Sequence, residues 1–285
     1  MGANNIILGT PNRIGPGATL SGGLWLAGLP LANLADPQFT KVARSTDATL
    51  TSTKFDVDFG TTRALRIIAL SNHNLSQGAT WRVTLGTSAG GAQVYDSGWV
   101  QVWRMTFDNE LLQWESPSWW TGTASNEFVG HPFPAVIALT DWLSARYGRV
   151  EINDTANAAG YVQIGRAHFC NGFEPVVNAE YGLKDGWRDL STMSSAESGA
   201  NWFTARRRIR TVQAVLPSLS QAEGDTLYEL MRSAGTVGEV FYVPRPADPG
   251  MCQRYGFAGR LVELSALDYP YYNRRGLPIR LEEIV

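Results

Sequence analysis

Residues 55–86 read FDVDFGTTRALRIIALSNHNLSQGATWRVTLG, and this stretch indicates the fold class of the first part of the chain. Residues 55–59 alternate apolar and acidic side chains with a period of two and end at a glycine, as a half-buried strand does. Residues 64–70 form a short apolar run that is closed by the turn residues 71–74, and residues 80–85 alternate again. Three strand patterns therefore follow one another with no helical pattern between them.

Similar patterns continue along the chain, separated by turns rich in Gly, Asn and Ser. They cover residues 92–95, 135–139, 149–152 and 161–169. Strands at such short intervals, without intervening helices, indicate an antiparallel β-sandwich rather than a parallel α/β sheet. We therefore expect one β-sandwich over residues 20–175, preceded by an N-terminal arm over residues 1–19.

The remainder of the chain has a different character. Residues 173–202 carry turn clusters and are interpreted as connecting structure or the edge of a second domain. Residues 220–223 (SQAE) form a capping box, and apolar residues at helical spacing then run to Gly235, so a helix of about 14 residues is predicted. Strands are predicted at 206–216, 237–243, 256–264 and 277–284, with a Pro-rich loop at 244–250. Residues 176–285 are expected to form a small α+β domain that serves assembly.

Composition and charge narrow the function classes. The 285 residues carry a net charge of −2, which supplies no positive field for general nucleic-acid binding. No stretch approaches the roughly 20 apolar residues of a membrane-spanning helix, and the first residues resemble neither a secretion signal nor a lipidation signal. Cys170 and Cys252 lie far apart with no metal-ligand spacing, so two buried, reduced thiols and no cofactor are expected.

One string is compatible with catalysis. Residues 86–90 (GTSAG) match the G-x-S-x-G pattern in which a serine, here Ser88, is presented at a strand-to-helix turn. The residues that follow predict strand and turn instead of a helix. A hairpin loop explains the string better than a hydrolase nucleophile, and no enzymatic activity is predicted.

Metal-ligating residue types are present but dispersed. The three histidines are His73, His131 and His168, and none pairs with another at metal-ligand spacing. Four aspartates, Asp36, Asp47, Asp56 and Asp58, gather before or within the first clear strand. Such oxygen-rich loops can hold a structural calcium, but EF-hand spacing is absent and solvated loop acids are the favoured interpretation. No metal site is predicted.

The only basic run is RRRIR at residues 206–210. On a strand it would place Arg206, Arg208 and Arg210 on one face, where guanidinium groups can bind phosphates or the carboxylates of an adjoining subunit. No aromatic side chains are interleaved on that face, so a subunit contact or plain solvation is favoured over nucleic acid.

Tryptophan is unusually concentrated. Seven of the 10 tryptophans lie between Trp81 and Trp142. We expect Trp81 and Trp142 to fill the sandwich core. Trp114, Trp119 and Trp120 lie in or near a loop-like Ser/Pro/Thr/Gly context and are expected at the surface, where aromatic rings stack on sugars or anchor protein interfaces.

Residues 55–86, together with ARYGRVEINDTANAAGYVQIGRAHF at 145–169, resemble the galactose-binding-like jelly roll of discoidin-type modules. The shared features are the Asp-Phe-Gly strand end, the apolar strand before an Asn-rich turn, the W-R-V strand and the closing strand pair. The resemblance implies a jelly roll. It implies no ligand site, because the loops of this fold differ between families.

The C-terminal part resembles structural proteins from the tails of tailed bacteriophages. The likeness lies in the capped helix, the GEVFYVP strand at 238–244, the GRL strand at 259–261, the tyrosine-rich turn and the terminal LEEIV. It implies a minor tail, tail-tip or baseplate component of a virion, assembled in the host cytoplasm with copies of itself and with other tail proteins.

Three hypotheses follow from the sequence. The first is a structural phage tail-tip protein that forms a homo-oligomer and displays its jelly roll, with a host glycan as an additional ligand. The second is a carbohydrate-binding module or lectin, whose site would include Trp114, Trp119 and Trp120. The third is a serine hydrolase that uses Ser88.

Overall fold

The computed structural model describes residues 4–15, 17–106, 113–115, 119–120, 122–123 and 133–285. The chain divides into two compact units. The sandwich unit comprises Met1–Glu174 and Phe241–Phe257, and the C-terminal unit comprises Pro175–Val240 and Ala258–Val285. The chain therefore leaves the sandwich unit, returns to it for 17 residues and leaves it again.

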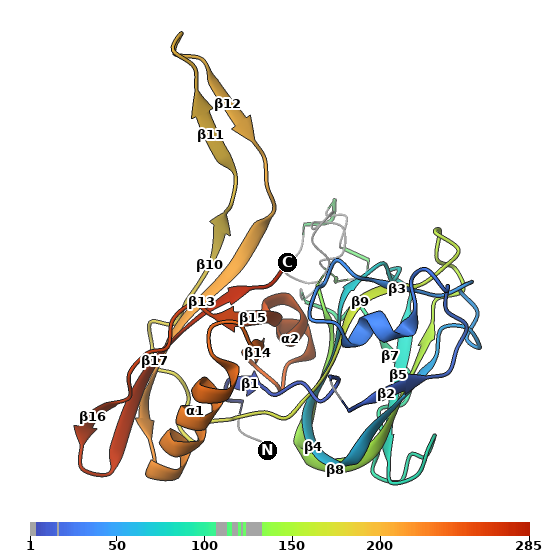
Figure 1. Ribbon diagram of the computed structural model, residues 1–285, viewed down its shortest axis with the longest axis horizontal. Helices are drawn as coiled ribbons and strands as arrows, with labels where there is room; N and C mark the ends of the chain where they lie inside the picture. Colours follow the sequence, from blue (N-terminus) through green and yellow to red (C-terminus); the bar gives the residue numbers. More distant parts are fainter. Residues whose placement is uncertain (1–3, 16, 107–112, 116–118, 121, 124–132) are drawn as a thin grey trace. The chain divides into compact units, whose positions relative to one another are not determined.

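An eight-stranded antiparallel sheet forms most of the sandwich unit (Figure 1). Its strand order is β3-β9-β4-β8-β5-β6, and β2 pairs with β4 while β7 pairs with β5. The strands are β2 (Thr19–Ser21), β3 (Ala43–Arg44), β4 (Phe55–His73), β5 (Thr80–Gly86), β6 (Tyr95–Asp96), β7 (Val100–Gln101), β8 (Ala135–Asn153) and β9 (Gln163–Cys170).

Two long strands fold this sheet into a sandwich. β4 and β8 have 19 residues each and bend together, with register shifts between Asp58 and Arg63 and between Leu65 and Ile67. Gly60, at φ 73°, adopts a conformation that favours glycine at the bend. The first half of β4 pairs with β2 and with the second half of β8, and this half of β8 also pairs with β5. The second half of β4 pairs with β9. Each long strand thus contributes to both layers.

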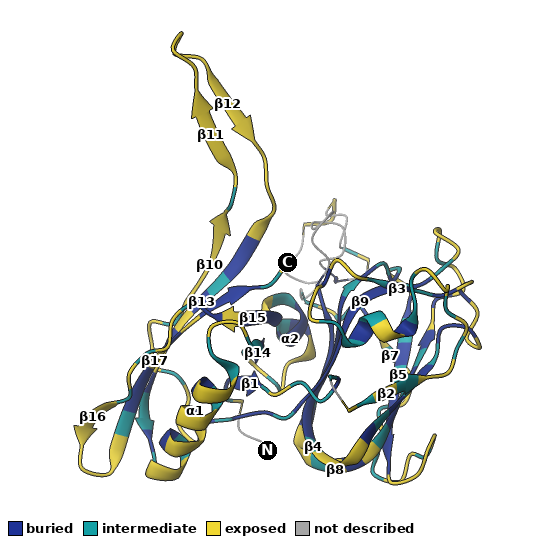
Figure 2. Ribbon diagram, viewed as in Figure 1, coloured by how far each residue is buried: buried dark blue, intermediate teal, exposed yellow. Residues whose placement is uncertain are grey.

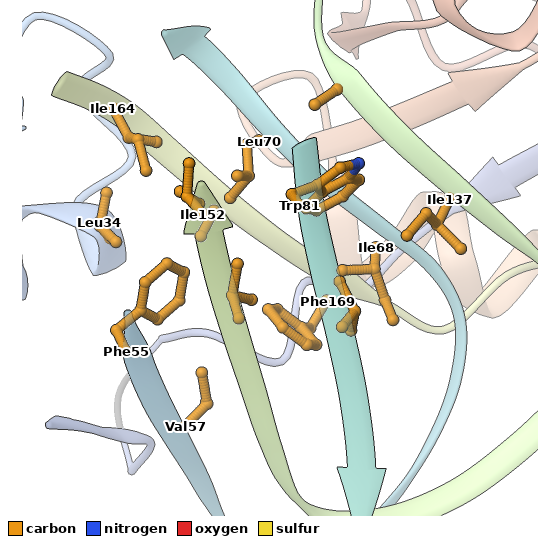
Figure 3. Close-up of a cluster of buried hydrophobic side chains, with 14 of the residues drawn as sticks. Leu34, Phe55, Val57, Ile68, Leu70, Trp81, Ile137, Ile152, Ile164 and Phe169 are labelled. Carbon is orange, nitrogen blue, oxygen red and sulfur yellow. The ribbon is translucent and has the colours of Figure 1, made fainter. Parts of the chain in front are cut away.

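The core lies between the two layers (Figure 3). Phe55 and Val57 alternate with outward-facing aspartates on β4, so one face of the strand is buried. Trp81 is fully buried and is among the largest core side chains, which confirms its predicted place. The other side chains labelled in Figure 3 are Leu34, Ile68, Leu70, Ile137, Ile152, Ile164 and Phe169.

Smaller elements complete the sandwich unit. The 3-10 helix η1 (Leu31–Ala35) contacts β3 and β9, and β1 (Ile7–Gly9) pairs antiparallel with the end of β14 (Glu239–Val243). Residues 6–8 of the N-terminal segment are buried. Helix α2 (Pro249–Tyr255) begins after the cap residue Asp248, whose side chain accepts a hydrogen bond from the backbone N–H of Met251.

The C-terminal unit is built on a second antiparallel sheet. Within it β17 (Arg274–Glu283) pairs with β15 (Phe257–Leu261), β16 (Asp268–Tyr271) and β13 (Arg208–Leu219), and β13 also pairs with β10 (Lys184–Asp189). Helix α1 (Gln221–Ala234) contacts β13 and β17 and buries Leu227 and Met231. Ser220 and Glu223 form the predicted capping box, and the backbone N–H of Gly235 caps the last turn, so this helix is confirmed.

A long hairpin extends from this sheet (Figure 2). Beyond the paired strands β10 and β13, the chain forms the two-stranded ribbon of β11 (Thr192–Ser195) and β12 (Asn201–Thr204). We call residues 184–208 the long hairpin. All of its residues are exposed except Leu190, which is partly exposed.

The predicted fold class is confirmed, because the protein is mainly β, with antiparallel sheets that form a sandwich and two α-helices. Two details differ from expectation and one is refined. The strands predicted at 55–59 and 64–70 are one bent strand. Residues 173–202, interpreted as connecting structure or the edge of a second domain, include β10 at the edge of the second sheet, β11 and part of β12. Residues 249–250, expected within a loop, begin α2, because proline fits the first turn of a helix.

Candidate functional site

The described tryptophans between residues 106 and 123 form an exposed aromatic cluster in the sandwich unit. Trp114 and Trp120 are 73% and 81% exposed, and Trp119 is partly exposed. The rings of Trp114 and Trp119 meet edge to face with centroids 6.5 Å apart. Gln113 and Glu115 flank Trp114 and are also exposed. The cluster therefore presents large apolar faces beside hydrogen-bonding groups.

Hydrogen bonds hold both ends of this segment. The backbone N–H of Thr106 donates to the carbonyl oxygen of Gly122 at 2.8 Å, which brings the two ends together. Gln77 Nε2 donates to Thr123 Oγ1 at 3.0 Å, and Thr123 is buried. The described tryptophans thus lie between two anchored points.

Helix α2 supports the entry to the cluster. The buried Gln253 accepts a hydrogen bond from the backbone N–H of Arg104 at 2.7 Å and donates to the carbonyl oxygen of Val102 at 2.7 Å. Gly250 approaches Met105 so closely that a Cβ there would clash with the Met105 carbonyl oxygen. This support was not predicted, because residues 244–250 were expected to form a loop, although Asp248 followed by proline is a recognisable helix start.

Trp142 was expected in the core, and this prediction was wrong. The side chain is 47% exposed because it lies on the bent part of β8, outside the space between the layers. Its Nε1 donates to the carbonyl oxygen of Gly172 at 2.9 Å, and the guanidinium of Arg66 lies 5.1 Å from the ring centroid. Trp142 therefore covers a buried charge.

Ser88 lies in a loop between two strands, as predicted. β5 ends at Gly86 and the chain enters β6 at Tyr95. Gln93 Nε2 donates to Ser88 Oγ at 2.7 Å, and the carbonyl oxygen of Ser88 accepts the N–H of Gly91. The strand-to-helix turn that would activate a serine nucleophile is therefore not formed at this place.

The described histidines are buried in separate surroundings. His168 is fully buried; its Nε2 lies 2.9 Å from Ser71 Oγ, and its ring contacts the rings of Phe39 and Phe241. His73 is buried against Trp103, and burial lowers the pKa of His73 to about 4. His131 lies outside the described residues.

The four aspartates do not converge. Asp56 and Asp58, on β4, pair with Arg149 and Arg146 of β8 at 2.6 and 3.1 Å. The other two engage their own loops, since Asp36 pairs with Lys41 and Asp47 accepts hydrogen bonds from Thr49. Within the part of the chain that the structure describes, no group of three or more His, Cys, Asp or Glu side chains is placed to hold a metal ion.

The basic run does not present three guanidinium groups on one face. Arg206 precedes β13 and is exposed, and Arg208 begins that strand, exposed and 3.7 Å from Asp189. Arg210 is only 7% exposed and pairs with Glu283 of β17 at 2.5 Å. The expected interface role of Arg210 is thus corrected, because this ion pair lies inside the C-terminal unit. For Arg206 and Arg208 it stays a prediction.

Both cysteines are buried free thiols. Cys252 Sγ donates to the carbonyl oxygen of Arg245 at 2.9 Å, and burial raises the pKa of Cys252 to about 12.

No α-helix among the described residues has both the length and the apolar character that a bilayer crossing requires.

Comparisons with known proteins found solved structures only. No protein-family model matches the chain, and no curated protein matches it. The family 32 carbohydrate-binding module of Clostridium perfringens NanJ, solved with galactose, is 10% identical with a TM-score of 0.38, and the match covers 57% of this chain and 99% of that one. A fucose-binding module of Streptococcus pneumoniae is 11% identical with a TM-score of 0.36, covering 57% and 98%.

A family 89 glycoside hydrolase from Clostridium perfringens is 14% identical with a TM-score of 0.35, and the match covers 58% of this chain but only 16% of the hydrolase. The family 32 neighbours have a galactose-binding-like jelly roll. The comparisons give no support to the expected phage tail protein.

Proposed function

We propose that the protein is a non-enzymatic, carbohydrate-binding protein whose sandwich unit holds a glycan against Trp114, Trp119 and Trp120. The observation that carries this proposal is the exposure of Trp114 and Trp120 on an anchored segment. Two indole rings that are exposed to water contribute little to the stability of the folded chain. A ligand that covers them would be stabilised by the free energy of burying their apolar surface.

The chemistry of the cluster suits a sugar. The C–H faces of a pyranose ring stack on aromatic rings, and the edge-to-face arrangement of Trp114 and Trp119 offers two differently oriented surfaces to such a ligand. The amide of Gln113 and the carboxylate of Glu115 can hydrogen-bond hydroxyl groups beside Trp114. Neither a metal ion nor a nucleophile is needed for this role.

The test is a binding screen of the full chain against neutral mono- and polysaccharides that include galactose and fucose. Trp120→Ala and Trp114→Ala are each expected to weaken binding about tenfold or more, because truncating an aromatic anchor costs at least about 1–2 kcal/mol. Trp99→Ala is the matched control, since Trp99 is exposed but lies outside the segment 106–123. Absence of binding across the panel, or equal losses in all three variants, would reject the proposal.

The second candidate is a structural role in a virion, as a minor tail, tail-tip or baseplate protein that assembles in the host cytoplasm with itself and with other tail proteins. The observation in its favour is the long hairpin, which exposes Trp187, Met193, Trp202 and Phe203. This role is compatible with glycan binding by the sandwich unit. Light scattering and negative-stain imaging test it: a closed ring or a defined oligomer supports the role, and a monomer at high concentration contradicts it.

A further inference from the structure

The long hairpin carries apolar side chains on both of its faces. Met193 and Phe203 are directly opposite each other on β11 and β12, whereas Trp202 is opposite Ser194 and therefore points to the other face. Met193, Trp202 and Phe203 are 60%, 70% and 73% exposed, and Trp187 of β10 is 51% exposed. No face of the ribbon is covered by another described part of the C-terminal unit.

Such a ribbon offers apolar side chains and open strand edges to a partner. A two-stranded hairpin alone is at best marginally stable in water, and its outer edges leave backbone groups open for pairing. The long hairpin has 25 residues, of which all but Leu190 are exposed. A standard protein interface uses about 20–30 residues on each side, so the hairpin by itself is large enough to form one side of a stable interface.

The same unit contains a surface that can receive an apolar side chain. A cavity of about 340 Å³ opens where residues 180–184 meet β13 and β17. Val215 and Ile279 line it, and Tyr181 stands at it with its side chain fully in solvent. The cavity is within the usual size range of a pocket that holds a small molecule or an aromatic anchor.

The cavity also offers two carboxylates with which guanidinium groups can pair. Glu180 and Glu263 line the cavity, and neither carboxylate forms an ion pair with any described residue; Lys184 and Arg280 lie beside them. The base of the hairpin carries the consecutive residues Arg206, Arg207 and Arg208. Guanidinium groups form bidentate contacts with carboxylates, which would fix the orientation of the hairpin on the cavity.

We propose that the long hairpin of one copy docks on this cavity of a second copy, with Trp202 or Phe203 as the apolar anchor and Arg206 and Arg208 facing Glu180 and Glu263. The docking part of the hairpin, residues 202–208, and the cavity are different surfaces of one chain, so the contact is head-to-tail and generates a ring or an open filament. The inference is independent of glycan binding and deepens the assembly role that was proposed second.

The experiment uses two complementary full-length variants. Trp202→Asp/Phe203→Asp disables the hairpin and keeps the cavity, and Val215→Arg/Glu263→Arg blocks the cavity and keeps the hairpin. All four side chains are exposed, so the fold tolerates the changes, and circular dichroism checks this. Val237→Arg is the matched control, because Val237 is an exposed valine of the same unit outside both surfaces.

Sedimentation velocity measures the outcome. Wild type and Val237→Arg are expected to self-associate, and each double variant is expected to do so at least about 30-fold more weakly. An equimolar mixture of the two double variants is expected to form a 1:1 dimer that grows no further, because only one intact hairpin and one intact cavity remain between the two chains.

Other outcomes would overturn the inference. A monomeric wild type contradicts both this contact and the assembly role. Undiminished association of the cavity variant would mean that hairpins pair with each other, which contradicts the contact but retains assembly. If Val237→Arg weakens self-association as much as the cavity variant does, the effect is not specific to the cavity, and the assignment of the cavity as the docking site is rejected. Glycan binding measured on the same samples is expected to be unchanged, which separates the two proposals.

Discussion

Arg66 and Glu174 form an ion pair inside the sandwich unit. Arg66 Nη2 lies 2.5 Å from Glu174 Oε2, and the two side chains are only 4% and 9% exposed. The pair joins β4 to the residue at which the chain leaves the unit, and Trp142 lies over the guanidinium. Both charged groups lose hydration when they are buried, and the attraction between them is the main interaction that offsets this loss.

Glu174→Gln is expected to destabilise the protein by about 3 kcal/mol, because it leaves the Arg66 guanidinium buried without its counter-charge. Arg66→Met combined with Glu174→Leu is expected to cost less than the sum of the single changes. Urea unfolding of wild type, the three single variants Glu174→Gln, Arg66→Met and Glu174→Leu, and the double variant gives the comparison. In the exposed pair of Glu229 and Arg232, Glu229→Gln serves as the control and is expected to leave the stability almost unchanged. Equal costs at both pairs would contradict the argument.

Gly250→Ala is expected to lower glycan affinity as well as stability. The added methyl group would meet the Met105 carbonyl oxygen and push α2 away from residues 102–106, which lead to the aromatic cluster. We expect a destabilisation of about 1–3 kcal/mol, typical of overpacking. Thermal unfolding and glycan titration measure the two effects. Gly28→Ala is the matched control, since a Cβ there meets nothing within 4 Å, and a wild-type affinity in Gly250→Ala would show that α2 does not support the site.

His73 is expected to make the stability depend on pH below neutrality. Its pKa is about 4 in the folded protein and returns to about 6.5 on unfolding, so the unfolded chain binds more protons between these values. The stability that the neutral His73 side chain contributes is therefore fully present above pH 6.5 and is lost as the pH falls. Near pH 4 this loss lowers the free energy of unfolding by about 3 kcal/mol.

The comparison chain for this effect is His73→Asn, whose amide oxygen can accept the N–H of Leu75 as His73 Nδ1 does. Urea unfolding between pH 7 and pH 4 is expected to show the stability advantage of wild type over the variant shrinking as the pH falls. A constant difference across this range would contradict the prediction.

Limited proteolysis is expected to begin in the long hairpin. Residues 206–208 are three consecutive exposed arginines outside or at the very start of β13, so trypsin has both its specificity residue and an accessible backbone there. At protein concentrations at which the chain self-associates, the same cleavage is expected to slow markedly. Mass spectrometry of the first fragments checks both statements, and a first cut within the sandwich unit would contradict them.

Local signals in the sequence were enough to predict some elements. Helix α1 was predictable to the residue because its capping box and Gly235 act over one or two turns. The strand patterns at 55–59 and 80–85 were recognisable because one face of each strand is buried against the core, so that apolar side chains recur at every second residue. Exposure of Trp114 and Trp120 was predictable from their polar neighbours.

Other features depend on contacts that no local pattern contains. The continuity of β4 through Gly60 requires β8 beside it, and the position of Trp142 depends on the bend that the two strands share. Arg210 resembles a surface residue until Glu283, 73 positions away, is brought next to it. The long hairpin lacks the buried face by which strands are recognised, although Met193 and Phe203 flank a Ser/Gly turn cluster in the manner of a hairpin.

The return of the chain to the sandwich unit at Phe241–Phe257 affects folding during synthesis and the exchange of units by recombination. The Phe241 ring against His168 and the Gln253 side chain at Arg104 are supplied only after all of residues 175–240 have left the ribosome. Until then the sandwich unit lacks parts of its own interior. Neither unit can therefore be exchanged between proteins as one uninterrupted stretch, and recombination that preserves the sandwich unit must carry the intervening segment with it or close the gap between Glu174 and Phe241.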